Sequence, residues 1–315
     1  MKTLVVGTGI IGTTWGWALS NAGINITHLV RPGNKDRYKN GITLDVLDGR
    51  KGHKKENVVK YDLKCVESIS ASDPYELIIV SVNFNKIDAV LDQLVPLSGD
   101  ATFLIFGANW FGVEPIEKRL PRERYLLGFP RGGGTQQDDT HYLVAMDPGV
   151  FLGEADGRRT EKLRRVESLF AQADFHADIP DNIIHLLWTS HAIAIGYGAG
   201  LAHSGDVDAF LRNRAALIHA YNVTKEIFEL CRRRGADPYK ALSLSALYKL
   251  PPWLFTLAVK SLSASTNGPG LKRILARLIQ TTNEKELRAA MLKTAEELKF
   301  DMPLLMAAGV EPQNV

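Results

Sequence analysis

The chain has 315 residues, of which 45% are hydrophobic and 23% charged, and its formal net charge at pH 7 is +3. This composition is ordinary for a globular protein, and the length allows two domains of typical size. The basic residues occur in short runs with acids mixed in or close by, without a basic face interleaved with aromatic residues. We therefore expect no nucleic acid among the partners.

The cysteines and the apolar stretches exclude further classes. Cys65 and Cys231 lie far apart and lack the spacings of zinc ligands or of a disulfide framework, so we expect no metal site and a reducing compartment. Glycines interrupt the apolar start, and no small-residue cleavage site ends it, which argues against a secretion signal. No later stretch reaches the roughly 18 to 20 apolar residues of a membrane span. We predict a cytoplasmic protein that contacts no membrane.

Short apolar runs in the first half predict the strands of a sheet. They are bounded by turn residues and rich in β-branched side chains, as strands buried on both faces of a parallel sheet are. The runs are 3–7, 24–30, 76–82, 102–107 and 124–130. Helical patterns alternate with them, so we predict an α/β domain with a Rossmann-type, doubly wound parallel sheet over residues 1–177.

Beyond residue 177 the pattern changes to apolar positions three and four residues apart, which indicates helices. The predicted helices are 181–203, 206–234, 237–248, 252–264, 269–281 and 283–299. We predict an all-α domain over residues 178–315 for substrate binding and dimerisation, because its long apolar helices could bury against a second copy. The apolar run 247–262 either lines a substrate pocket or forms a buried core helix.

A glycine pattern at the first strand predicts a dinucleotide site. Gly7, Gly9 and Gly12 follow a strand and open a helix. In this context the first glycine permits the tight turn, the second lets the backbone approach the pyrophosphate, and the third lets helix and strand pack closely. The alternative is a glycine-rich turn without a ligand. The expected cofactor-binding residues of this loop are Gly7, Thr8, Gly9, Ile10, Ile11 and Gly12.

Arg31 indicates which dinucleotide binds. It stands at the end of the second predicted strand, where a cofactor with a free 2′-hydroxyl calls for Asp or Glu, and Lys35 and Arg37 follow it. A guanidinium suits a 2′-phosphate, so we expect NADP(H) rather than NAD(H). The alternative is that Arg31 is only a solvated residue at a strand end.

With these motifs the chain resembles the ketopantoate reductase family, and the resemblance extends over nearly all of it. Further matching segments are 106–112, 151–188 and 297–303, of which the middle one is the most specific. The resemblance implies a Rossmann domain followed by a helical domain, an active site in the cleft between them, and reduction of a carbonyl by a nicotinamide cofactor.

The resemblance also implies individual site residues. Asn109 corresponds to the family's asparagine beside the nicotinamide and substrate, although a turn asparagine after a strand is an alternative. Asn83 stands where the family often has a lysine near the cofactor. The family's substrate-binding glutamate corresponds to Asn283 or, with a shift of one residue, to Glu284.

The family's catalytic lysine is missing. It lies two residues after the tryptophan that corresponds to Trp188, so Ser190 takes its place, and Ala194 replaces an asparagine one helical turn further on. His191 stands beside the vacant position and could protonate an alkoxide near neutral pH, with Ser190 binding a substrate oxygen. The alternative for His191 is a buried core histidine. His185 and His203 are weaker candidates.

From these observations we predict an NADPH-dependent oxidoreductase of the ketopantoate-reductase-like family. Its small-molecule substrate is a carbonyl compound, a 2-oxo acid or a related ketone, which it reduces to the alcohol by hydride transfer. The predicted catalytic residues are His191, Ser190 and Asn109. Two alternatives remain: an opine-type dehydrogenase acting on an imine, and a non-catalytic NADP(H)-binding regulatory protein. We expect a homodimer.

Overall fold

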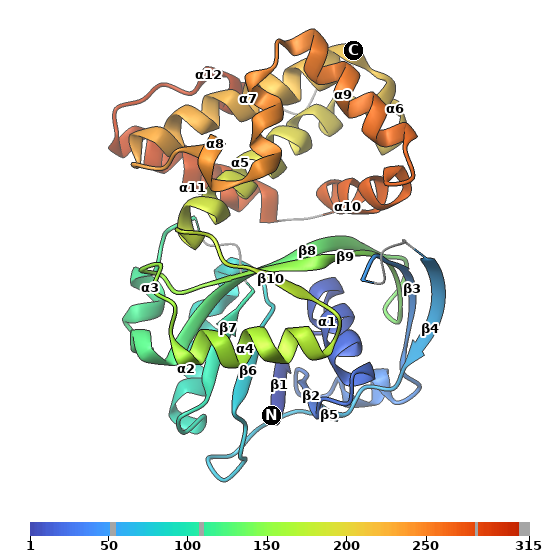
Figure 1. Cartoon of the computed structure of the whole chain (residues 1–315), viewed down its shortest axis with the longest axis vertical. Helices are drawn as coiled ribbons and strands as arrows, with labels where there is room; N and C mark the ends of the chain where they lie inside the picture. Colours follow the sequence, from blue (N-terminus) through green and yellow to red (C-terminus); the bar gives the residue numbers. More distant parts are fainter. Residues whose placement is uncertain (51–54, 107–109, 281–282, 309–315) are drawn as a thin grey trace. The chain divides into compact units, whose positions relative to one another are not determined.

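The computed structural model describes residues 1–50, 55–106, 110–280 and 283–308. It divides into two compact units, Met1–Ile183 and Ile184–Val315, which Figure 1 shows in blue to green and in yellow to red. The first unit contains a ten-stranded sheet with helices, and the described part of the second is helical. The predicted fold class is confirmed. The predicted boundary after residue 177 falls inside the last strand, His176–Asp178.

The sheet has the order β4-β3-β9-β8-β7-β6-β1-β2-β5, with β10 paired to β9. From β5 to β8 neighbouring strands are parallel, which is the strand order of a doubly wound dinucleotide-binding fold. The strands are β1 (Thr3–Val6), β2 (Ile26–Leu29), β3 (Ile42–Asp48), β4 (Lys55–Tyr61), β5 (Cys65–Val66), β6 (Leu77–Val80), β7 (Thr102–Ile105), β8 (Tyr125–Gln136), β9 (His141–Gly153) and β10 (His176–Asp178).

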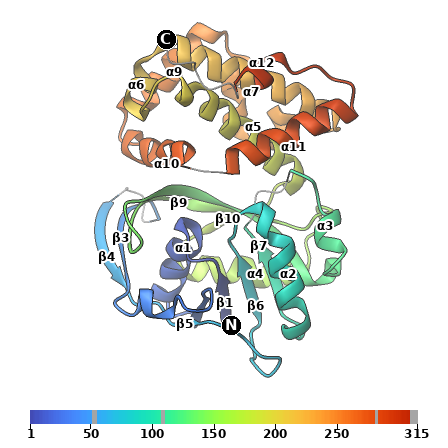
Figure 2. The ribbon, with the colours of Figure 1, turned by 180° about the vertical axis from the view of Figure 1, so that it is seen from behind.

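Helices cover both faces of this sheet. In Figure 1 α4 lies in front of the strands, and in the reverse view of Figure 2 α2 does. The helix α1 shares one core cluster with α4, within which Trp15 stacks on Phe175 with ring centroids 6.1 Å apart. The helices of this unit are α1 (Ile10–Asn21), α2 (Ile87–Leu94), α3 (Glu114–Glu117) and α4 (Glu161–Gln172), with 3₁₀ turns η1 (Lys35–Tyr38), η2 (Phe84–Lys86), η3 (Val95–Leu97) and η4 (Arg122–Arg124).

The sheet extends beyond the predicted parallel part. The strand β8 was expected to end at Pro130, before three glycines, but after an irregularity between Pro130 and Gly132 it continues antiparallel to β9. The glycines allow this because a methyl group on Gly134 would overlap the backbone of Leu143 in β9. Beyond β9, β3 is parallel to it and β4 antiparallel to β3, so the sheet is mixed.

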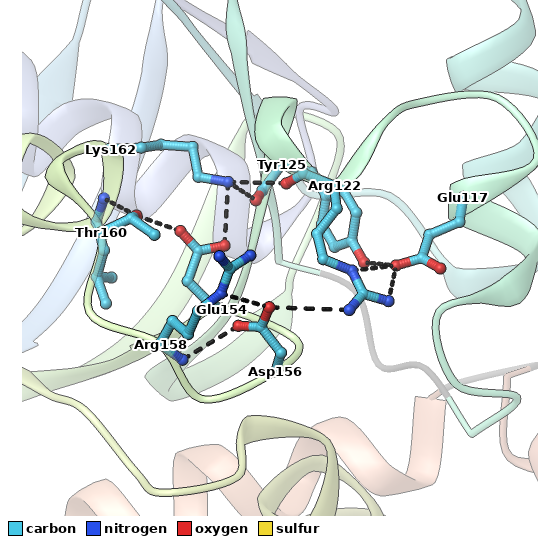
Figure 3. A network of polar contacts seen from close by, with 9 residues as sticks. Glu117, Arg122, Tyr125, Glu154, Asp156, Arg158, Thr160 and Lys162 are labelled. Atoms are coloured by element: carbon cyan, nitrogen blue, oxygen red, sulfur yellow. Dashed lines mark hydrogen bonds and ion pairs between the residues drawn. The ribbon is translucent and has the colours of Figure 1, made fainter.

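A buried ion pair connects α4 to the sheet (Figure 3). Glu154, only 3% exposed, lies just after β9, and Lys162 Nζ lies 3.0 Å from its Oε2. The same ammonium donates to the carbonyl oxygens of Arg122 at 2.9 Å and Tyr125 at 2.6 Å. Thr160 donates to Glu154 and accepts from a backbone amide of α4, which it caps. This network fixes the start of α4 against the ends of β8 and β9.

The second unit consists of helices packed around α7. The predicted helix 206–234 is two helices in the structure, because the Asn213 side chain accepts from the amides of Ala215 and Ala216 and starts a new helix. The predicted helix 237–248 is α8 followed by a 3₁₀ segment. The elements are α5 (Ile183–Ala202), α6 (Val207–Arg212), α7 (Arg214–Arg233), α8 (Pro238–Ala241), η5 (Ser243–Lys249), α9 (Pro252–Ala264), α10 (Gly268–Gln280), α11 (Asn283–Glu297) and α12 (Pro303–Ala307).

Glycines bring α5 close to α7. A methyl group on Gly196 would overlap Thr224 and approach the carbonyl oxygen of Ala220 to 2.8 Å, and one on Gly200 would approach that of Ala216 to 2.8 Å. These positions are one helical turn apart, so one face of α5 packs closely against the backbone of α7. Within the described residues, no helix is long and apolar enough to cross a membrane.

Candidate functional site

The turn from β1 to α1 has the close packing that its glycines predict. Gly7 has a φ of +103°, a conformation that side-chain-bearing residues rarely adopt. A methyl group on Gly12 would overlap the Gly7 carbonyl oxygen and the Ser81 hydroxyl. Ser81 follows β6 and donates to the Val6 carbonyl oxygen at 2.9 Å. The loop therefore lies where β1 and β6 end side by side, the position at which doubly wound sheets bind ligands.

The start of α1 is open to an anion. Gly9 precedes the helix in an extended conformation with no side-chain cap, and the first turn contains no acidic residue. A Cβ built on Gly9 would meet no atom within 4 Å. Because the first amides of a helix have no partners within it and lie at its positive end, a pyrophosphate fits here. The residues present thus suit the dinucleotide that the sequence predicts.

Thr8, at the centre of the loop, is held from two sides. Its hydroxyl is hydrogen-bonded to Tyr38 Oη at 2.9 Å, and Tyr142 Oη donates to its carbonyl oxygen at 2.8 Å. Burial raises the pKa of Tyr142 to about 12, so this phenol remains a hydrogen-bond donor. Both tyrosines therefore position the loop. Neither could be recognised from the sequence, because neither belongs to a motif.

The structure separates the basic residues that follow β2. Arg37 forms an ion pair with Asp139, and its guanidinium lies 5.8 Å from the centre of the Tyr38 ring. Arg31 is exposed, and among the described residues no carboxylate pairs with it. The backbone between them is fixed by Glu67, which accepts from the Lys35 amide at 2.9 Å. Unlike Arg37, Arg31 thus has no paired carboxylate within the described part of the chain.

Two asparagines complete the predicted cofactor contacts. Asn83 is exposed at the start of η2, shortly after β6, and thus follows a strand that neighbours β1. Asn109 lies outside the described residues, so its predicted place beside the nicotinamide stays a prediction.

In the helical unit, Ser190 and His191 are both on α5. His191 is 6% exposed, and neither its Nε2 nor the Ser190 hydroxyl has a hydrogen-bond partner within the described part of the chain. Burial, with a smaller contribution from the charge of Arg277, lowers the pKa of His191 to about 4. His191 is therefore neutral near pH 7. Its surroundings do not favour the titration near neutrality that we expected for a proton donor at this position. Ser190 is less buried, as is Ala194 one turn further.

Glu284 approaches the same helix from α11. Its carboxylate lies against Gly198, so closely that a methyl group on this glycine would overlap it. Burial raises the pKa of Glu284 to about 7, although the charge of Arg288 opposes this. His191 and Gly198 lie on the same side of α5, about 10 Å apart along its axis. A carboxyl group that carries a proton near pH 7 thus lies two turns from the predicted site.

The other histidines considered are elsewhere. His185 stacks on Trp188 with ring centroids 5.6 Å apart. His203 lies beside His219 at the far end of α5, with ring centroids 4.8 Å apart, and its Nδ1 is hydrogen-bonded to the Ala199 carbonyl oxygen. In the described residues no group of three or more His, Cys, Asp or Glu side chains could hold a metal ion.

Comparisons with known proteins bear on the family and the fold of the chain. The family model for ketopantoate reductase PanE/ApbA matches residues 3–157. The uncharacterised oxidoreductase YkpB of Bacillus subtilis is 23% identical over 309 residues, 97% of this chain and 95% of that protein.

Solved structures of low sequence identity have the same fold. The 2-dehydropantoate 2-reductase of Geobacter metallireducens has a TM-score of 0.74 at 14% identity, covering 98% of this chain and 97% of that one. A D-mandelate dehydrogenase, in a ternary structure with NADH and anilino(oxo)acetate, has a TM-score of 0.76 at 15% identity, covering 98% and 96%.

Proposed function

We propose that the protein uses NADPH to reduce a 2-oxo acid or a related ketone to the alcohol, because residues 3–157 match the family model for ketopantoate reductase PanE/ApbA and the chain has the fold of such oxidoreductases. The observation that carries the proposal is the open start of α1 at Gly9, with the exposed Arg31 at the end of the neighbouring strand. The first suits a pyrophosphate and the second a 2′-phosphate.

The nicotinamide supplies the hydride, so the protein must orient the substrate and provide a proton. The residues proposed to bind the cofactor are Gly7, Thr8, Gly9, Ile10, Ile11, Gly12, Arg31, Asn83 and Asn109. Asn109 is proposed to contact both nicotinamide and substrate, as the family resemblance implies.

Ser190 and His191 remain the proposed replacements for the family's lysine. A neutral imidazole can donate a hydrogen bond to the substrate carbonyl, and the Ser190 hydroxyl can do the same. Glu284 is a second candidate for the proton donor, and the observation in its favour is its burial against Gly198. A general acid works best when its pKa lies near the operating pH, a condition that Glu284 meets and His191 does not.

The function is tested by incubating the protein with NADPH and a panel of 2-oxo acids, with and without amines, while the absorbance of NADPH is followed. We expect oxidation of NADPH that needs no amine. Turnover that requires an amine would indicate an opine-type dehydrogenase instead. Tight NADPH binding without oxidation by any carbonyl compound would favour a regulatory protein and contradict the proposal.

The proton donor is tested by His191→Gln and Glu284→Gln. Loss of a general acid lowers turnover by about 10²- to 10⁴-fold, and cofactor affinity should be unchanged because neither residue belongs to the nucleotide loop. A pH profile of kcat that falls above about pH 7 in the parent protein and is flat in Glu284→Gln would assign the proton to Glu284. Full turnover in His191→Gln would remove His191 from the mechanism.

We also propose a cytoplasmic homodimer. Trp253 and Leu257 lie one turn apart on α9 and are each 57% exposed, whereas Phe255 and Val259 on the same helix are buried. The helix therefore has both a core side and an apolar outer side that a second copy could cover. Sedimentation that shows only the 34.8 kDa monomer at micromolar concentration would contradict the dimer.

A further inference from the structure

A cavity in the helical unit is lined mostly by charged side chains. It lies where α6, α9 and α10 pack against one another, and Figures 1 and 2 both show these helices at the same end of the unit. The cavity has a volume of about 370 Å³ and is open to solvent. Its lining residues are Asp208, Leu211 and Arg212 of α6, Lys260 and Ser263 of α9, and Lys272 of α10. None of them takes part in the candidate site described above.

The charges around this cavity do not balance. Three cations line it together with one carboxylate, and that carboxylate is already paired, because Lys272 Nζ lies 2.6 Å from Asp208 Oδ1. The hydrogen bond and charge of Lys272, and to a smaller extent the charge of Arg212, lower the pKa of Asp208. Within the described ranges of the chain, neither Arg212 nor Lys260 forms an ion pair with a carboxylate. The lining therefore has a surplus of two positive charges.

The start of α10 adds to this positive field. Ser263 lies beside it, since a methyl group on Gly268, the first residue of α10, would overlap the Ser263 carbonyl oxygen. The first turn of α10 contains no acidic residue, and the first amides of a helix lie at its positive end. The Ser263 hydroxyl donates to the Lys260 carbonyl oxygen at 2.8 Å, and its hydrogen can turn towards a ligand oxygen instead.

A phosphate group matches this lining better than a carboxylate does. Near pH 7 a phosphate monoester carries a charge close to −2 and offers three acceptor oxygens, whereas a carboxylate carries a single charge. A guanidinium binds phosphate with two parallel hydrogen bonds, and an ammonium binds it as a point charge. The volume of about 370 Å³ falls within the range of roughly 300–1,000 Å³ found for small-molecule sites, so there is room for the body of a small molecule as well.

We propose that this cavity binds a small molecule through its phosphate group, as a second anion site outside the nucleotide loop. Arg212 and Lys260 neutralise the phosphate, and Asp208 holds Lys272 beside them. The inference does not depend on the proposed reductase function, because the cavity shares no residue with the proposed cofactor and catalytic residues.

Isothermal titration calorimetry with inorganic phosphate and with glucose 6-phosphate tests the site. NADP⁺ is kept in excess to occupy the nucleotide loop. We expect a binding event that weakens by about 10-fold or more in Arg212→Gln and in Lys260→Met, as for a lost hydrogen bond between charged groups. Glucose, which lacks the phosphate, should give no binding heat, and acetate should bind more weakly than phosphate at pH 7.

The variant Asp208→Asn should change the affinity in the opposite direction. It removes the one carboxylate among the described lining residues and releases Lys272, so phosphate should bind more tightly than it does to the parent protein. A gain in affinity cannot result from a damaged fold. Arg214→Gln is the matched control, because Arg214 is exposed, lies two residues from Arg212 and is not among the described lining residues. It should bind phosphate as the parent protein does.

The outcomes that would overturn the site are distinct. Equal losses in Arg214→Gln and Arg212→Gln would show that phosphate follows the overall charge of the protein. Phosphate binding that neither Arg212→Gln nor Lys260→Met weakens, or weaker binding in Asp208→Asn, would place the anion elsewhere. Acetate that binds as tightly as phosphate would contradict the assignment to phosphate. Vesicles containing phosphatidate that bind through Arg212, without binding of glucose 6-phosphate, would make the ligand a lipid and contradict the small molecule.

Discussion

Glu284 packs its carboxyl group directly against the backbone of Gly198, and this contact joins α11 to α5. The two neighbouring glycines of α5, Gly196 and Gly200, instead accommodate α7. The three glycines therefore differ in what they accommodate: Gly196 and Gly200 allow α7 to pack closely, and Gly198 leaves space for the carboxyl group of Glu284.

Alanine substitutions should distinguish a glycine that contacts α7 from the glycine that contacts Glu284. Gly196→Ala should lower the free energy of unfolding by about 1–3 kcal/mol, because the methyl group would meet Thr224 and the α7 backbone. Gly198→Ala should cost much less, since it displaces only the end of a flexible side chain, but it should move the Glu284 carboxyl group towards water. Chemical denaturation measures both changes, and equal losses would contradict the distinction.

The pH dependence of stability should reveal Glu284. Its pKa is about 7 in the folded protein against 4.5 for an ordinary glutamate, so the folded state holds the proton more tightly. This contribution is present below about pH 4.5 and is lost as the pH rises through 7. Glu284→Gln should remove it, and the difference in melting temperature between the two proteins should change across this range.

Glu286→Gln provides the matched control for that measurement, because Glu286 lies on the same helix and is exposed. The buried His28 and His191, each with its pKa lowered to about 4, act in the opposite direction: their contribution is lost as the pH falls from 6.5 towards 4. Because both histidines are present in the parent protein and in Glu284→Gln, their contributions cancel in the difference in melting temperature between these two proteins. A difference that stays constant from pH 4.5 to 7 would show that Glu284 is not buried as described.

Cofactor choice should depend on Arg31. Arg31→Ala should weaken NADPH binding by about 10- to 100-fold, as expected for a lost hydrogen bond between charged groups, and leave NADH binding nearly unchanged. Arg37→Ala is the control, because Arg37 is already paired with Asp139. Titration of protein fluorescence with each nucleotide gives the affinities, and a parent protein that binds NADH as tightly as NADPH would refute the assignment.

The network in Figure 3 predicts unequal effects of two charge deletions close in sequence. Lys162→Met leaves the buried Glu154 carboxylate without its cation, which should cost about 3–5 kcal/mol of unfolding free energy. Arg158→Met removes a cation that is 67% exposed, although it pairs with Asp156 at 2.7 Å, and should cost less than about 1 kcal/mol. Urea unfolding of both variants is the test, and similar midpoints would show that the ion pair at Glu154 contributes little.

The sequence predicts those parts of the fold that depend on local pattern. The strand β1, the glycine loop that opens α1, and α9 follow from apolar runs and turn residues that lie close together in the sequence. The strands β3 and β9 were not predicted, because their mutual pairing joins segments distant in sequence. The break at Asn213 was missed because the apolar periodicity continues through it, whereas the side-chain cap that interrupts the helix is a local hydrogen bond.

The candidate site was likewise predictable only where it depends on a local sequence motif. The nucleotide loop has a motif, and the structure gives it the expected geometry. Glu284 lies on a helix remote in sequence from His191, so its burial against α5 could not be deduced from the sequence. The effect of burial on His191 was equally hidden, because a pKa depends on what surrounds the side chain after folding.

The hydrogen bond from Tyr142 to the carbonyl oxygen of Thr8 has a consequence for how the protein is made. A loop that begins seven residues into the chain receives one of its two supports only from a strand that starts at His141. During synthesis the loop therefore cannot reach its final shape until the chain beyond Tyr142 has left the ribosome. A fragment that stops at Pro130, before this strand, would retain the whole glycine motif and still lack part of what shapes it.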